Sequence, residues 1–186
     1  MQLALYKIWI FMRSLFRPRI HSFGERITHK YRVSLFDLDE YFHMNNARYL
    51  TYMELGRFDL VIRSGFFRYA LKNKIMAPVV NTTIIYRRSL QPFQKFSVSN
   101  QLVYWDETSM YVESVVMSRG KLYTLAIKEI RVVQNGNTVP LNSITQGMGI
   151  DLPELHYPEI LIQDKKKLVK DLLQYAETKY SNGNNP

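Results

Sequence analysis

One stretch of the chain, residues 37–50, places two aspartates, a histidine and two asparagines just ahead of a long, mostly apolar segment. It reads Asp-Leu-Asp-Glu-Tyr-Phe-His-Met-Asn-Asn-Ala-Arg-Tyr-Leu. The alternating residues 31–36 before it predict a strand, so the acids lie where a strand ends and the chain turns toward a helix. Functional side chains are often found on such loops. Asn45 or Asn46 could cap the helix, and the N–H groups of its first turn would then face whatever the acids and His43 hold.

This string, with its Asp-Leu-Asp, His-Met-Asn-Asn and Arg-Tyr-Leu parts, resembles the signature of hotdog-fold thioesterases of the 4-hydroxybenzoyl-CoA thioesterase type. The thioesterase-superfamily member 6-like proteins are the nearest group. The resemblance covers approximately residues 27–133 and implies an α+β hotdog fold, a curled antiparallel sheet wrapped around one long central helix, with helical extensions at both ends. It also implies hydrolysis of an acyl-CoA or acyl-carrier-protein thioester to a free acid and a thiol.

The resemblance gives a role to each residue that matches the motif. Asp39 matches the catalytic carboxylate, either a general base or a nucleophile, and both roles stay open. His43 matches the motif histidine, which would orient water or donate to the thioester oxygen. N–H groups at the helix start would complete an oxyanion hole. Asp37 is expected to organise the loop by accepting backbone N–H bonds. Structural roles in the motif are expected for Asn45, Asn46 and Tyr49.

Two positions depart from the relatives. Many relatives have glycine where Phe42 stands, and the plant acyl-carrier thioesterases have asparagine where Tyr41 stands. Phe42 is expected to narrow the pocket or alter the loop. The missing amide at position 41 puts the water-positioning scheme of the plant enzymes in doubt for this chain.

Each candidate also has a purely structural interpretation. An aspartate such as Asp39 at a strand end is often a turn former or helix cap, and a lone histidine such as His43 is often a satisfied, partly buried side chain. Glu54 and Asp59 lie on the central helix, where some hotdog thioesterases place their base. The spacing of Glu54 and Arg57 favours an ion pair instead.

Other basic side chains could bind phosphate groups, and the histidines outside the motif could bind a metal. Arg87 and Arg88, with Arg119 and Lys121, could meet the phosphates of coenzyme A at a sheet edge, or form a solvated strand end. His21, His29 and His156 have no recognisable metal spacing, so no metal is predicted. No cofactor is predicted either.

Length and composition indicate one domain with extensions. The 186 residues, 46% hydrophobic, are divided into an apolar and basic N-terminal helix with linker (1–24), a hotdog thioesterase-like domain (25–141) and a C-terminal extension (142–186). The absence of cysteine excludes disulfides, thiolate nucleophiles and Cys-type zinc sites. The net charge is +9, yet no basic run is longer than residues 165–167 and no nucleic-acid motif is present, so nucleic-acid binding is not predicted.

The coarse pattern predicts one helix followed by an antiparallel sheet. Residues 47–63 are apolar on almost every side and predict a buried helix ending at Ser64-Gly65, followed by a shorter helical or irregular connection over residues 66–74. Four strands follow in order, joined by turns short enough for hairpins. Their expected ranges are residues 77–88, 96–105, 110–118 and 122–134, with a further turn at Asn135-Gly136-Asn137.

Both ends of the chain carry helical segments. Residues 1–16 are rich in apolar and aromatic side chains but too short to span a bilayer. They predict either a helix in which residues 1–19 contact a membrane surface, or a helix docked on the sheet or on a partner subunit. The segment from about 163 to 180 predicts a helix whose apolar edge docks on the core or a second subunit. That edge comprises Leu168, Leu172 and Tyr175, and residues 181–186 are expected to be disordered.

Two functions from different classes remain. The first is an acyl thioesterase that holds the acyl chain in an apolar tunnel between helix and sheet, with sites shared across a homodimer or homotetramer. The second is a non-catalytic acyl- or lipid-binding hotdog protein held near a membrane. A cytoplasmic location, with or without peripheral membrane contact, fits both.

Overall fold

The computed structural model describes residues 2–20, 24–149 and 159–180. The chain divides into two compact units, residues 1–155 and 156–186. The first unit begins with α1 (Gln2–Leu15), β1 (Ile27–Arg32), the short 3₁₀ helix η1 (Leu35–Asp37), α2 (Asn46–Arg63) and α3 (Phe66–Asn73). It continues with β2 (Ile75–Met76), β3 (Val79–Tyr86), β4 (Lys95–Trp105), β5 (Ser109–Ser118), β6 (Lys121–Arg131), β7 (Val133–Gln134), β8 (Asn137–Thr138) and α4 (Leu141–Met148). The second unit contains α5 (Glu159–Tyr180).

The main sheet is antiparallel, with the strand order β1-β4-β5-β6-β3. The expected hairpins β4–β5 and β5–β6 are confirmed. The expectation that β3 and β4 form a hairpin is wrong, because β3 pairs with β6 at the opposite edge. The connecting segment is tied elsewhere: the N–H of Leu90 donates to the hydroxyl of Tyr49, and its carbonyl accepts from the N–H of Met44.

The first strand is displaced from its expected position. β1 covers residues 27–32 instead of 31–36, and the last two expected strand residues belong to η1. Ser34 ends the extended segment because its hydroxyl caps η1, while the carboxylate of Asp37 accepts from the N–H of Ser34. This reciprocal capping box turns the chain away from the sheet.

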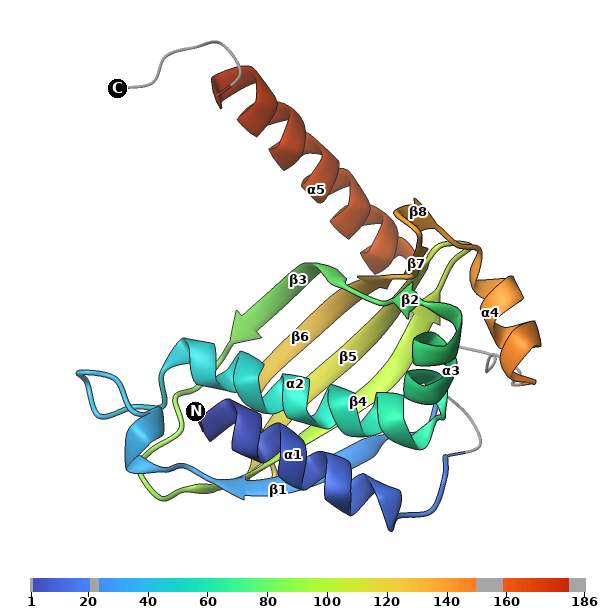
Figure 1. Cartoon of the computed structure of the whole chain (residues 1–186). Coiled ribbons are helices and arrows are strands. Elements are labelled where there is room, and N and C mark those ends of the chain that lie inside the picture. Colours follow the sequence, from blue (N-terminus) through green and yellow to red (C-terminus); the bar gives the residue numbers. More distant parts are fainter. Residues whose placement is uncertain (1, 21–23, 150–158, 181–186) are drawn as a thin grey trace. The chain divides into compact units, whose positions relative to one another are not determined.

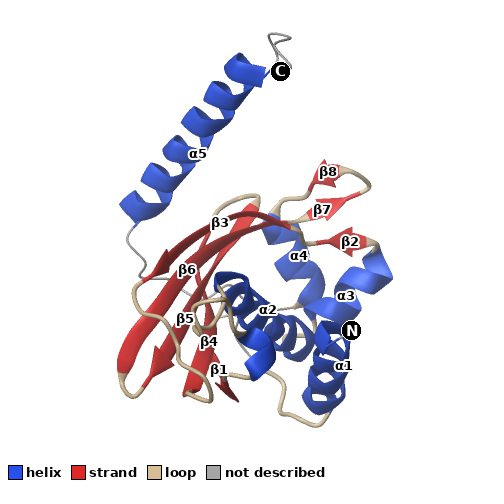
Figure 2. Cartoon of the chain, turned by 90° about the vertical axis from the view of Figure 1, so that its left-hand side faces the viewer, coloured by secondary structure: helices blue, strands red, loops and turns tan. Residues whose placement is uncertain are grey.

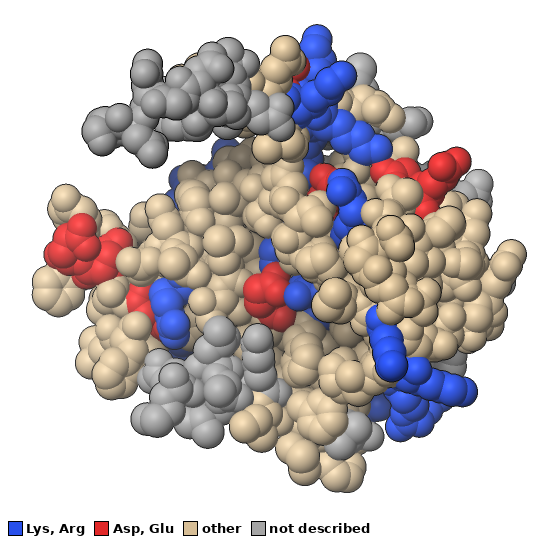
Figure 3. Space-filling view, turned by 45° about the horizontal axis from the view of Figure 1, so that its top comes forward, with Lys and Arg blue, Asp and Glu red and all other residues tan. Residues whose placement is uncertain are grey.

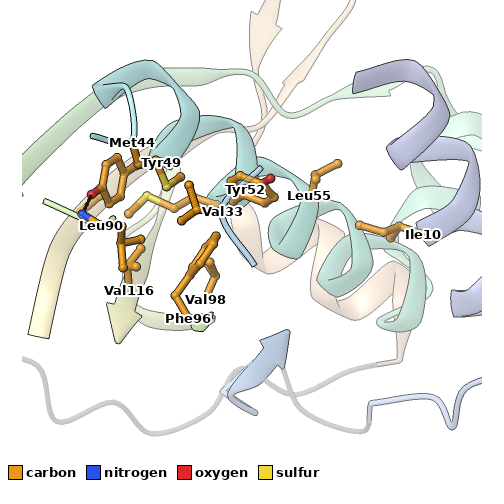
Figure 4. Close-up of a cluster of buried hydrophobic side chains, with 12 residues drawn as sticks. Ile10, Val33, Met44, Tyr49, Tyr52, Leu55, Leu90, Phe96, Val98 and Val116 are labelled. Carbon is orange, nitrogen blue, oxygen red and sulfur yellow. Dashed lines mark hydrogen bonds between the residues drawn. The ribbon is translucent and has the colours of Figure 1, made fainter. Parts of the chain in front are cut away.

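The curved sheet wraps around α2 (Figure 2). As expected, α2 is largely buried, and it begins one residue earlier than predicted. Its side chains join those of β1, β4, β5 and β6 in a core that includes Tyr52, Met53, Leu55, Phe96 and Val98 (Figure 4). Burial of such side chains contributes about 1.5–3 kcal/mol each. The long helix is therefore fixed as the centre of the unit.

Helix α1 packs against α2 on the side away from the sheet (Figures 1 and 2). Ile10 and Ser14 of α1 are buried. The segment is docked within the chain, but on α2 and not on the sheet as expected. Contact with a membrane surface or a partner subunit stays a prediction, and another face of the segment is exposed. Its exposed apolar side chains are Ile8, Trp9, Met12 and Phe16. Among the described residues, no helix is both long and apolar enough to cross a membrane.

A second core lies beyond the end of α2. It joins α3 and α4 to the sheet through Phe66, Leu102, Ile130, Leu141 and Ile144. The expected C-terminal extension from residue 142 therefore begins with a helix that contributes to this core. The small sheet β2-β7-β8 lies next to it, and the predicted turn is confirmed, with positive φ at Asn135 and Gly136.

The expected C-terminal helix is present as α5. Its Leu168, Leu172 and Tyr175 side chains are each more than half exposed. Docking of this edge on the core or on a second subunit stays a prediction. The expected disorder of residues 181–186 concerns residues outside those that the structure describes.

Candidate active site

The loop between η1 and α2 is a narrow turn that projects beside the start of α2 (Figure 1). Leu38 and Met44 form an antiparallel bridge across its base. Inside that bridge, the N–H of Asp39 donates to the carbonyl of His43 at 2.9 Å. The backbone thus holds Asp39 and His43 opposite each other, as neighbours of the helix start.

The two oxygens of the Asp39 carboxylate differ in their hydrogen bonds to the described residues. Its Oδ1 accepts from the N–H of Tyr41 at 3.0 Å and from the N–H of His43 at 3.1 Å. Within the described part of the chain, Oδ2 has no hydrogen bond and the side chain has no ion pair. The residue is partly exposed. Asp39 therefore does form the turn, and the same geometry leaves one oxygen able to take a proton from water or to attack a carbonyl.

The two motif side chains are not paired with each other. His43 is partly buried, and only its backbone N–H contacts the Asp39 carboxylate. Its imidazole makes no hydrogen bond to the residues that the structure describes. The ring therefore retains both nitrogens for water or substrate.

Phe42 has a backbone conformation that L-residues seldom adopt. Its φ is +57° and its side chain is 72% exposed. Glycine adopts this left-handed region without a steric penalty, which explains why many relatives have glycine here. Tyr41 next to it is also exposed. Phe42 therefore alters the loop through a strained backbone conformation, and its expected effect on a pocket stays a prediction.

Asp37 holds the loop to α2. The buried carboxylate accepts from Arg48 Nε at 2.7 Å, from the Tyr52 hydroxyl at 2.7 Å and from the N–H of Ser34 at 2.9 Å. Its carbonyl accepts from the N–H of Asn45. Sequence reasoning had placed Asp37 as the loop organiser but missed Arg48, although Arg48 is part of the motif.

The remaining motif residues fix the helix start. The Asn45 side chain caps α2 by accepting from the N–H of Ala47 at 2.9 Å. Asn46 is the first helical residue, and its carbonyl accepts from the Tyr86 hydroxyl at 3.2 Å. Tyr49 is buried, with its hydroxyl accepting from the N–H of Leu90 (Figure 4). Burial raises the pKa of Tyr49, and the nearby charge of Asp39 adds to this effect.

Glu54 is poorly suited to act as a base. It pairs with Arg57 at 2.7 Å, as the spacing predicted, and also with Lys128 of β6 at 2.7 Å. Burial alone would raise the pKa of Glu54, but the two cations outweigh it and lower the pKa to about 2. Lys128 is only 1% exposed and was missed. The signal was a lysine at a strand position that alternates with Ala126 and Ile130 and so shares their inward face.

Asp59 serves the packing of α1 on α2. The buried carboxylate contacts Ser14 Oγ, His29 Nε2 at 3.1 Å and Arg17 Nη1 at 3.4 Å. Arg63 lies at 3.5 Å. Burial would raise the pKa of Asp59, but the hydrogen bonds from His29 and Ser14 lead to a net lowering. This carboxylate is fully engaged and lies apart from the motif loop.

The four expected phosphate-binding cations are brought to one region. Arg87 and Arg88 donate their backbone N–H groups to the carbonyl of Tyr123, which is close to the β5–β6 turn that carries Arg119 and Lys121. All four side chains are exposed. Figure 3 shows basic and acidic side chains next to each other at several places on one face. Among the described residues no group of three potential ligands could hold a metal, and His21 and His156 lie outside them.

Residues 33–152, more than half of the chain, match the family model described as the thioesterase-like superfamily. The chain belongs to this superfamily. Protein THEM6 of Danio rerio is 37% identical over 121 residues, 64% of this chain and 59% of that protein. Protein THEM6 of Xenopus laevis is 30% identical over 169 residues, 86% of this chain and 80% of that protein.

Bacterial proteins show the same relationship. The long-chain acyl-CoA thioesterase FadM of Escherichia coli is 37% identical over 71 residues, 38% of this chain and 54% of that protein. The crystal structure of YbaW, a probable thioesterase from Escherichia coli, matches with a TM-score of 0.62 and 25% identity, covering 66% of this chain and 95% of that chain. The superfamily membership confirms the expected hotdog fold and the class of thioester hydrolases.

Proposed function

We propose that this protein hydrolyses acyl-CoA thioesters, with Asp39 as general base or nucleophile. The observation that carries the proposal is the asymmetric Asp39 carboxylate, with one oxygen held by two backbone N–H groups and the other unbonded within the described chain. Coenzyme A is favoured over a carrier protein by the bacterial relative named for long-chain acyl-CoA. The exposed cations around Arg87 and Arg88 suit the phosphates of coenzyme A.

The geometry accommodates two routes. As a base, Asp39 Oδ2 takes a proton from a water that attacks the thioester carbonyl, and the tetrahedral intermediate then releases the thiol. As a nucleophile, Oδ2 attacks the thioester carbonyl, the C–S bond breaks and the thiolate leaves as the thiol, and water then hydrolyses the resulting anhydride to the free acid and the Asp39 carboxylate. His43 orients the water or the substrate. The start of α2, three residues after His43, offers a partial positive charge to the oxyanion.

The first test replaces one oxygen of the candidate carboxylate. Asp39→Asn should lower kcat by about 10²–10⁴-fold in a thiol-release assay with acyl-CoAs, because the amide cannot accept the proton. Glu40→Gln, at the exposed neighbouring position, is the matched control and should retain activity. Full activity of a folded Asp39→Asn protein would refute the proposed role.

A second candidate function is favoured by the exposed face of α1. Ile8, Trp9, Met12 and Phe16 are at least half exposed, and Arg13 stacks over Trp9 at 5.0 Å. Apolar rings beside cations suit the surface of an anionic membrane, so the alternative is a membrane-associated lipid-binding protein without turnover.

Sedimentation with phosphatidylserine vesicles tests this alternative. Because α1 also packs on α2, point variants are preferable to a deletion. Trp9→Ser combined with Phe16→Ser should reduce vesicle binding by about tenfold or more if α1 inserts. Leu172→Ser, on an exposed face of α5, is the matched control. Unchanged binding of the double variant would argue against the membrane role, and bound lipid without thiol release would favour the alternative over hydrolysis.

A homodimer is part of the proposal. β3 pairs only with β6 among the described strands, so its other edge offers backbone groups to a second copy. Analytical ultracentrifugation should show twice the monomer mass or a multiple of it. A monomer at assay concentration would remove the shared-site part of the proposal.

A further inference from the structure

Three residues of β3 face the central helix. Paired residues on neighbouring strands point to the same side of a sheet, and Lys128 of β6 reaches Glu54 of α2. The β3 partners on this face are therefore turned toward α2 as well. The pairs are Thr82 with Lys128, Ile84 with Ala126, and Tyr86 with Thr124.

One end of this row lies at the candidate active site. The Tyr86 hydroxyl donates to the carbonyl of Asn46, and its ring lies 5.6 Å from that of Tyr49. Both partners belong to the first turn of α2, beside the loop that carries Asp39. A substrate whose thioester is at Asp39 would therefore have this row within reach of its acyl chain.

The middle of the row is apolar and incompletely covered. Leu50 of α2 and Ile84 of β3 pack against the first core but are only partly buried. Such side chains gain about 25 cal/mol for each Å² that an alkyl chain removes from water. This apolar row, Tyr86 to Ile84 with Leu50, is continuous with the proposed site.

The other end of the row is charged. Glu54, Arg57 and Lys128 form an ion cluster in which Glu54 touches both cations at 2.7 Å. Eight helical residues separate Asn46 from Glu54, or about 12 Å at ~1.5 Å per residue. Four strand residues separate Tyr86 from Thr82, or about 13 Å at ~3.3 Å per residue. The distance along α2 agrees with the distance along β3. The apolar row therefore ends at the ion cluster on the helix side and on the strand side.

We propose that the Glu54–Arg57–Lys128 cluster sets an upper limit on the length of the acyl chain that this protein accepts. The inference rests on the proposed function and adds the substrate class, acyl groups of short to medium length. A longer chain would have to cover the partly exposed charges, and desolvating ions without new partners is unfavourable. With ~1.3 Å per methylene, from a C–C bond of about 1.5 Å, the row holds about nine or ten carbons.

The test measures the affinity of non-hydrolysable S-alkyl-CoA thioethers from butyl to hexadecyl by titration calorimetry. For the wild-type chain, the Kd should fall by about fourfold per methylene, as burial of each CH₂ at ~0.8 kcal/mol implies, and then level off near decyl. A Kd that continues to fall through hexadecyl overturns the proposal.

A variant removes the cluster without leaving a lone buried charge. Glu54→Leu combined with Arg57→Leu and Lys128→Met replaces all three charges by apolar side chains, a change that often leaves stability intact. In this variant the Kd should keep falling beyond decyl, by about tenfold or more at hexadecyl, with butyl binding unchanged. The matched control, Glu113→Leu with Arg26→Met, removes an ion pair of β5 outside the row and should keep the wild-type plateau.

The outcomes separate the two proposals. A folded variant with an unchanged plateau overturns the length limit even if the protein hydrolyses acyl-CoAs. Thioether binding with the expected plateau, but no thiol release from any acyl-CoA, overturns hydrolysis and leaves the length limit standing. No binding of any thioether overturns both.

Discussion

Two aspartates two residues apart divide structure and chemistry between them. Asp37 is buried and bonded to Arg48 and Tyr52, so its carboxylate is fully used in holding the loop on α2. Asp39 is partly exposed, with only one of its oxygens engaged in the described part of the chain. The two aspartates have different roles because their burial and hydrogen bonds differ, and a sequence motif does not show these differences.

Replacement of Asp37 should affect stability first. Asp37→Asn removes the partner of the Arg48 cation, and breaking such a pair costs about 3–5 kcal/mol. Urea denaturation followed by circular dichroism measures the loss. Glu40→Gln should stay within about 0.5 kcal/mol of the wild type. A similarly small change for Asp37→Asn would show that the loop does not depend on this carboxylate.

Replacement of Phe42 by glycine should not destabilise the protein, in contrast to replacement of Asp37. Its left-handed conformation is unfavourable for an L-residue by about 1–2 kcal/mol, whereas glycine loses about 0.5–1 kcal/mol of chain entropy. Phe42→Gly should therefore leave the free energy of unfolding unchanged or raise it by up to about 1 kcal/mol. Phe36→Gly, an exposed residue of η1, should lower it, and equal losses in the two variants would contradict the strain argument.

At this scale the sequence predicted where the site residues lie but not all of their contacts. The Glu54–Arg57 pair followed from helical spacing, which is a local rule. Lys128 joins that pair from a strand 74 positions further along the chain, so no local rule could have revealed it. The positive φ of Phe42 was not predicted, because the sequence shows only a departure from the glycine of the relatives at this position.

At the scale of elements, α2 is held on both sides by charged and polar contacts. Asp59 ties it to α1 through Ser14 and to the segment after α1 through Arg17, and Glu54 ties it to β6 through Lys128. On the sheet side, Gly56 allows close approach to β4, since an added Cβ would lie 2.2 Å from Asn100 Nδ2. The position of α2 thus depends on the carboxylates of Glu54 and Asp59 and on the absence of a side chain at Gly56.

Acid should loosen these attachments. The folded-state pKa values of Glu54 and Asp59 are lowered, so these groups bind protons less readily when folded than when unfolded. Their contribution to stability is present above their ordinary pKa of about 4 and is lost as the pH falls through the folded-state pKa, which is about 2 for Glu54. Thermal unfolding from neutral to acid pH should show a falling Tm. Glu54→Gln should reduce this fall, and an unchanged acid limb would refute the assignment.

The close contact at Gly56 gives a separate expectation. Gly56→Ala places a methyl group against the buried Asn100 amide, and overpacking of this kind costs about 1–3 kcal/mol. Chemical denaturation measures it, and Asn100→Ser in the Gly56→Ala background should recover part of the loss. A stabilised Gly56→Ala protein, as ordinary helix propensity would give, would contradict the tight packing.

At the scale of the whole molecule, pattern reasoning predicted the elements better than their arrangement. The buried helix, the three central strands and the hotdog class followed from apolar periodicity and the motif. The place of β3 did not, because strands that follow one another in sequence often pair, and here the Leu90 segment is bonded to Tyr49 and Met44 instead. The end of β1 was predicted too late because Ser34 caps a 3₁₀ turn.

The pairing of β3 with β6 has a consequence for synthesis of the chain. The second long strand to leave the ribosome is an outer strand of the finished sheet, and its partner, residues 121–131, is made about forty residues later. Until then its Val80 and Ile85 side chains and its backbone are available to other nascent chains. Formation of this edge of the sheet therefore has to wait until residues 121–131 have been made.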